Sequence, residues 1–158
     1  MIFMQLLAFF AFVFSAFSAT ARAASCTAEE VDALGFSVEN INDESLKRLN
    51  TTRLCMRKVT MKHISKTDAK YADFLCKKLG AALTKSGLTV PSTGCLKCFS
   101  ESTRCAVENC KAACLAGDLT AGCVSCFQEH CEKDLHDCIG FTTINPADHK
   151  SALAKLAK

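Results

Sequence analysis

The residues best suited to chemistry are two Cys-X-X-Cys pairs, Cys95 with Cys98 and Cys123 with Cys126. Four thiolates in two such pairs are typical of a structural zinc site, and a single pair can act as a redox centre. The eight other cysteines of the chain and the lack of glycine after each pair favour disulfides instead. We therefore expect no metal and no cofactor.

A short run, Leu-His-Asp-Cys at residues 135–138, resembles the helical His-Asp pair of secreted phospholipases A2. The resemblance implies hydrolysis of phospholipid by a calcium-activated water at His136. Those enzymes also carry a glycine-rich calcium loop and a doubled cysteine, and the sequence contains neither. A small phospholipase-like hydrolase is therefore the third of our functional hypotheses, and we expect no catalytic residues.

The cysteines between residues 95 and 138 are arranged as mirror images about a turn near Gly117 and Asp118. Four cysteines before the turn match four after it, because the residue numbers in each pair add up to 236 or 237. A constant sum is what antiparallel pairing requires, and Gly and Asp are typical turn residues. The pattern predicts an antiparallel helical hairpin, from about 95 to 116 and from about 120 to 139, with four disulfides. The predicted bridges join Cys98 to Cys138, Cys105 to Cys131, Cys110 to Cys126, and Cys114 to Cys123.

Helix geometry sets a condition on this hairpin. At about 100° per residue, the five-residue step from Cys105 to Cys110 rotates the cysteine face by about 140°. The step from Cys126 to Cys131 does the same in the second arm. Either both helices bend or carry a wide turn at this level, or only the tip pairs form and the remaining cysteines bond to the N-terminal helices. We favour the bend.

The remaining four cysteines are expected to form two more disulfides. Four cysteines allow three pairings, and the sequence does not choose among them. They are Cys26, Cys55, Cys76 and Cys95.

The first 23 residues are expected to be a secretory signal peptide. The segment is almost wholly apolar up to Phe17, and Ala21, Arg22 and Ala23 form a small-X-small cleavage pattern. Retention as an anchor is the alternative, since no Lys or Arg precedes the apolar run. Cleavage after Ala23 leaves all 12 cysteines in the mature chain, which is the composition of a disulfide scaffold. We therefore predict a secreted, extracellular protein.

The predicted fold class is all-α and disulfide-rich, with residues 24–158 as one domain. It comprises an N-terminal helical segment, acidic and then basic, at 24–94, the cysteine-rich hairpin at 95–140, and a tail or short helix at 141–158. No stretch shows strand-like alternation of useful length. Met56 and Met61 are expected in the core. The expected helix starts are Thr27 with Glu30, Asn42 or Asp43, Ser65 with Asp68, Thr93, and Asn145 with Pro146.

Charge divides the N-terminal segment. Residues 24–46 hold six acidic residues and no Lys or Arg, whereas residues 47–85 hold 11 basic residues and two acidic ones. The basic block could attract an anionic partner, although a solvated helix face is the simpler interpretation. The candidate surface consists of Lys47, Arg48, Arg53, Arg57, Lys58, Lys62, Lys66 and Lys70.

These features favour a secreted, non-catalytic binding or interaction protein whose ligand is unknown. Its partner would be a protein or an anionic surface, and the few aromatic residues argue against nucleic acid. The alternative is a membrane-active protein similar to saposins, which are also helical and disulfide-bonded, although the cysteine spacing differs from their six-cysteine pattern. Asn50 begins an Asn-Thr-Thr sequon and is a candidate glycosylation site, although its position within a helix presents it poorly.

Overall fold

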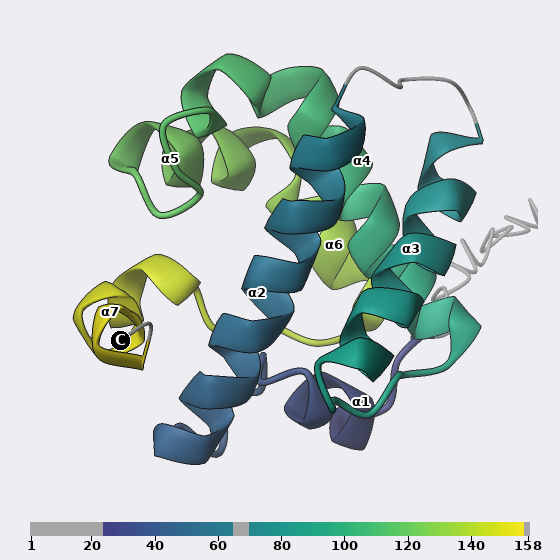
Figure 1. The fold of residues 1–158 in the computed structure, drawn as a ribbon, viewed down its shortest axis with the longest axis vertical. Coiled ribbons are helices and arrows are strands. Elements are labelled where there is room, and N and C mark those ends of the chain that lie inside the picture. The colour runs from purple at the N-terminus through teal and green to yellow at the C-terminus, as the bar shows by residue number, and fades with distance from the viewer. Residues whose placement is uncertain (1–23, 65–69, 157–158) are drawn as a thin grey trace, which may run out of the picture.

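The computed structural model describes residues 24–64 and 70–156, and the regular structure within them is entirely helical (Figure 1). With five disulfides, this is the all-α, disulfide-rich fold class that the sequence predicted. The elements are α1 (Ala28–Ala33), α2 (Asp43–His63), α3 (Tyr71–Lys85), α4 (Thr93–Cys114), α5 (Ala121–His130), α6 (Glu132–Ile139), the 3-10 turn η1 (Pro146–His149) and α7 (Lys150–Leu156).

The first two helices begin at capping boxes. The Thr27 hydroxyl accepts the Glu30 N–H at 3.2 Å, and the Glu30 carboxylate accepts the Thr27 N–H at 2.8 Å. Asn42 and Ser45 exchange the equivalent bonds at the start of α2, both at 2.9 Å. Each box satisfies N–H groups that have no partner within the helix, so both predicted helix starts are confirmed.

Helix α3 packs between α2 and α4 through an apolar stripe. Tyr71, Leu75, Leu79 and Leu83 recur every four residues and are all buried. The helix start expected at Ser65 and Asp68 lies outside the described residues.

The hairpin consists of one continuous arm and one interrupted arm. Helix α4 is a single helix of 22 residues, and its N-cap is Ser92 rather than the expected Thr93, since the Ser92 hydroxyl accepts the Cys95 N–H at 3.3 Å. The second arm is divided at Cys131, whose φ of −128° and ψ of −25° are not helical. The interruption expected at the same level in both arms therefore occurs only in the second.

This break resolves the conflict in the spacing of the cysteines. Because of the break, α5 and α6 do not continue along one helix axis. Figure 1 shows α5 at the upper left and α6 near the centre. Each half of the second arm can then meet the face of α4 on which its partner cysteines lie, although those faces are about 140° apart.

The C-terminal residues return to the body of the protein. The Asn145 side chain accepts the Ala147 N–H at 3.0 Å and caps the turn that starts at Pro146, as predicted. Leu153 of α7 is buried against α2. The tail is thus docked rather than frayed.

One large core joins the N-terminal segment to the hairpin. Phe36, from the connector after α1, contacts Phe99 of α4 with ring centroids 5.2 Å apart. Leu49 of α2, Leu83 of α3 and Ile139 of α6 are fully buried in the same cluster. Burial of each such side chain contributes about 1.5–3 kcal/mol, so the hairpin and the N-terminal helices stabilise one another.

Candidate functional site

The disulfides are the most prominent feature of the molecule. Four of them cross the hairpin and are the same four pairs that the sequence predicted. The fifth joins Cys26 to Cys95 and attaches the segment before α1 to the first turn of α4.

Both Cys-X-X-Cys pairs are consumed by these bridges, and each cysteine bonds outside its own pair. A sulfur in a disulfide is not a thiolate and cannot serve as a normal zinc ligand. The zinc and redox-centre hypotheses for these pairs are therefore wrong for the oxidised chain.

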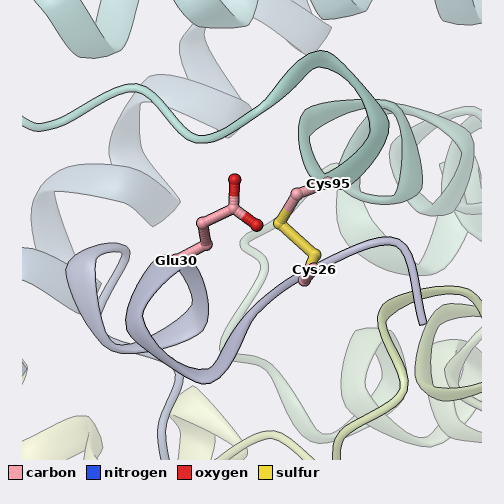
Figure 2. A group of neighbouring side chains, drawn as sticks. All are labelled: Cys26, Glu30 and Cys95. Carbon is pink, nitrogen blue, oxygen red and sulfur yellow. A yellow bond between two sulfur atoms is a disulfide. The ribbon is translucent and has the colours of Figure 1, made fainter.

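One cluster of metal-ligating residue types surrounds the fifth bridge, namely Cys26, Glu30 and Cys95 (Figure 2). The two sulfurs are bonded to each other, which leaves the carboxylate without thiolate companions. It accepts the backbone N–H of Ser92 at 2.5 Å and that of Thr27 at 2.8 Å. Glu30 therefore connects α1 to the N-cap of α4, and these two hydrogen bonds, chiefly the one from Ser92, hold the pKa of its carboxyl below the ordinary value of 4.5.

Glu30→Gln is expected to lower the melting temperature at neutral pH, because a neutral amide is a weaker acceptor for the two N–H groups. A carboxyl whose pKa is lowered by folding stabilises the protein above its ordinary value of 4.5, and this contribution is lost as pH falls through the folded-state pKa. The difference between variant and parent should therefore shrink in acid. Glu44→Gln, in the exposed first turn of α2, is the matched control. A difference that persists unchanged at acid pH would contradict this role.

The expectation of a sixth disulfide is wrong, because Cys55 and Cys76 are free and buried. The Cys55 sulfur lies 3.3 Å from the Ser86 hydroxyl at the end of α3. Cys76 is about 15 Å further back along α3, at 1.5 Å per residue, and its thiol is near Ser100 of α4. Burial raises the pKa of the Cys76 thiol. The two sulfurs thus face different helices.

The arginines of the predicted basic surface are engaged by acidic residues. Arg48 pairs with Asp32 at 3.1 Å. Arg53 and Arg57 both donate to Asp118 in the loop between α4 and α5, at 2.7 and 3.2 Å. These arginines fasten neighbouring segments together instead of forming one continuous patch.

The lysines of that surface that the structure describes are exposed. Lys47, Lys58 and Lys62 project from one side of α2, and within the described residues they form no ion pair. Lys70 is exposed at the start of α3, and Lys66 lies outside the described residues. The unpaired basic side chains of α2 therefore form a narrower surface than the sequence suggested.

Asn50 is a poor glycosylation acceptor in the folded chain. Its side chain is buried within α2, and its amide oxygen accepts an N–H of Arg53 at 2.8 Å. Attachment of a glycan would require this part of α2 to open.

The His-Asp pair of α6 does not form a catalytic arrangement. The His136 Nε2 accepts the Thr143 N–H at 3.3 Å and lies 3.1 Å from the Thr143 hydroxyl, which holds the segment after α6 against that helix. Asp137 is exposed and pairs with Lys133 on the same helix. The two side chains have separate structural partners, which removes the geometric support for a phospholipase-like site.

The clearest candidate site is a cavity of about 230 Å³ bounded by α2, α4, α5 and the segment after α6. It exceeds the engineered cavity of about 150 Å³ in another protein that binds benzene. Most of its lining is apolar, and both methionines that the sequence assigned to the core lie on its wall. Met56 is half-buried against the core, but Met61 is 41% exposed, so the core assignment of Met61 is wrong. The apolar lining includes Met56, Met61, Ala106, Val107, Val124 and Phe127.

The loop between α4 and α5 closes one side of this cavity. Leu115 and Leu119 line it from the loop, and the ion pairs of Asp118 with Arg53 and Arg57 tie the loop to α2. The sequence carries one signal of this cavity, because three apolar residues of the hairpin take no part in the cysteine pairing. They are Val107, Val124 and Phe127.

No family model, curated protein or solved structure matches the chain. No helix in the described parts of the chain has the length and apolar character needed to cross a membrane. The fold and the site therefore define the protein by themselves, as a disulfide-rich helical protein with an apolar cavity beside its cross-linked hairpin.

Proposed function

We propose that this chain is a secreted, non-catalytic binding protein that holds a small apolar ligand in the cavity between α2, α4 and α5. The observation that carries the proposal is the cavity itself, with its mainly apolar lining. Its apolar lining is partly open to solvent, and exposed apolar patches on a protein surface commonly mark binding sites. Apolar cavities that are preformed are the usual sites for small ligands.

The disulfides support this proposal because they fix the walls of the cavity. Two bridges, from Cys110 to Cys126 and from Cys114 to Cys123, join α4 directly to α5. A wall that is already ordered loses little conformational entropy when a ligand binds. Disulfides also persist mainly in oxidising compartments, which agrees with secretion directed by residues 1–23.

The test is the binding of the apolar dye N-phenylnaphthylamine, whose fluorescence rises in apolar surroundings. We expect saturable binding of one dye per chain, with a dissociation constant on the order of micromolar. Ala106→Trp should weaken binding by about tenfold or more, because the half-buried Ala106 lines the cavity and the indole would fill it.

Ala112→Trp is the matched control, since Ala112 lies on the same helix but is exposed and does not line the cavity. Circular dichroism and thermal unfolding establish that both variants are folded. Should Ala106→Trp not fold, Val124→Phe fills the same space with fewer added atoms. Equal dye binding by the cavity and control variants would refute the proposal.

A second candidate, action on anionic membranes, is favoured by the outer face of α2. Leu54 is 45% exposed there, beside Lys58 at helical spacing, and Met61, at the edge of the cavity, is 41% exposed next to Lys62. Exposed apolar and basic side chains on one helix face are typical of helices that lie on membranes. Dye release from anionic vesicles that is lost in Lys58→Glu/Lys62→Glu would support this candidate, whereas no release from such vesicles would eliminate it.

A further inference from the structure

We infer that the ligand of the cavity is an anionic amphiphile with a single hydrocarbon chain, such as a fatty acid. This inference rests on the proposed function, since it names the class of ligand for the same cavity. It is carried by the position of the charged side chains relative to the apolar lining.

Cationic side chains outnumber the acidic ones that line the cavity. Arg53, Arg57 and Lys111 contribute to the lining, together with the carboxylates of Asp118 and Glu132. Asp118 is shared between the two arginines, so one carboxylate compensates only one of two guanidinium charges. The side of the cavity near the loop therefore has an excess of positive charge.

Lys111 adds to this excess. It is exposed near the end of α4, lines the cavity, and forms no ion pair within the described residues. A long lysine side chain can lie along apolar surface while its ammonium group remains in water. This residue is thus suited to contact a headgroup at the edge of the cavity while the chain of the ligand lies inside.

Arg53 has a hydrogen-bond donor to spare. Its Nη1 donates to Asp118 and its Nη2 donates to Asn50, but its buried Nε–H has no partner among the described residues. A buried donor without an acceptor is unfavourable, and a carboxylate oxygen is a strong acceptor for a guanidinium group. The Nε–H has no exposed surface in the structure, so a ligand carboxylate would bond to it only after the Arg53 side chain shifts toward the cavity.

Two hydroxyl groups along the wall, those of Thr60 and Thr103, are already used as donors and do not compete for the headgroup. The Thr60 hydroxyl donates to the Met56 carbonyl at 2.7 Å, and the Thr103 hydroxyl donates to the Phe99 carbonyl at 2.8 Å. Both bonds lie within a helix. The interior therefore selects for hydrocarbon, and the choice of headgroup falls to the cationic side.

The experiment compares decanoate with decanol as competitors of N-phenylnaphthylamine on the purified protein at neutral pH and low salt. The two compounds share a chain and differ in headgroup charge. We expect decanoate to bind about tenfold more tightly than decanol, which corresponds to about 1.4 kcal/mol. Added salt should weaken the binding of decanoate but not that of decanol.

Lys111→Gln should remove most of the preference for decanoate and leave decanol binding unchanged. Lys47→Gln is the matched control, because it removes an exposed lysine of α2 that does not line the cavity. Equal binding of decanoate and decanol, or a preference that survives Lys111→Gln, would overturn the inference while leaving the proposed function intact. If neither compound displaces the dye, or the dye itself does not bind, the proposed function fails.

Discussion

Gly35→Ala is expected to destabilise the protein by about 4 kcal/mol or more, a loss that few single substitutions cause. Gly35 ends α1 with a φ of +82°, a region that costs other residues about 1–2 kcal/mol. A Cβ atom there would also lie 2.3 Å from the Leu49 nitrogen and 2.5 Å from the Ser45 carbonyl oxygen. Both are backbone atoms of α2, so the clash can be relieved only by moving α1 away from α2.

Gly87→Ala separates the two parts of this effect. Gly87 has a similar φ of +75°, but a Cβ atom there would meet nothing within 4 Å. Its loss should be about 1 kcal/mol, since only the backbone conformation is penalised. Thermal and denaturant unfolding measure both variants, with an expected fall in melting temperature of about 10–20 °C for Gly35→Ala. Similar losses in the two variants would show that the contact between α1 and α2 is looser than described.

Replacing Cys26 and Cys95 together by alanine is expected to cost about 4 kcal/mol, the largest loss for any one bridge. The residues are 69 positions apart, and the entropy that a disulfide removes from the unfolded chain grows with the length of the loop it closes. Because Cys55 and Cys76 are free, no other bridge shortens this loop. The double substitution also creates no new unpaired thiol, since both partners are removed.

The matched comparison is the double alanine variant of Cys114 and Cys123, which removes the same atoms at the tip of the hairpin. These cysteines are 9 positions apart, and the bridge from Cys110 to Cys126 already closes the tip. We expect a loss of about 2 kcal/mol or less. The free energy of unfolding, measured in denaturant under non-reducing conditions, tests the order, and a larger loss at the tip would contradict the loop-length account.

The hairpin could be predicted because its restraints lie within one stretch of sequence. Antiparallel arms impose a constant sum on paired residue numbers, and helix geometry predicted a bend in both arms, between Cys105 and Cys110 and between Cys126 and Cys131. Periodicity could not show that only one arm would be interrupted. The structure leaves α4 continuous and interrupts the second arm at Cys131.

The remaining cysteines could not be paired from the sequence because their distances depend on how α2 and α3 pack. Cys55 and Cys76 both occupy inward positions, which fits either a disulfide or two buried thiols. The two sulfurs lie at different levels of α3, because Cys55 of α2 contacts Ser86 at the end of α3, whereas Cys76 lies within α3, ten positions before Ser86. A disulfide needs Cα atoms within about 7 Å, a condition that only the three-dimensional arrangement can test.

The sequence indicates apolar residues of the hairpin but could not predict the cavity that they line. Met56 and Phe127 are residue types that usually pack in a core. Only the tertiary structure shows that no other side chain fills the space between them. The ion pairs of Arg53 and Arg57 could not be predicted from the sequence either, because their partner Asp118 is more than 60 positions away along the chain. Local patterns describe faces of helices, whereas a cavity depends on the gap between them.

The most direct test of the central claim, that the cavity binds an apolar ligand, is an NMR titration of ¹³C-methyl-labelled methionine with decanoate. The chain has four methionines, and the two among the described residues, Met56 and Met61, both line the cavity. Met56→Leu and Met61→Leu assign their signals. The account predicts that both signals shift and saturate together, and that Ala106→Trp suppresses the shifts while Ala112→Trp does not. Signals that stay unmoved at saturating decanoate would contradict it.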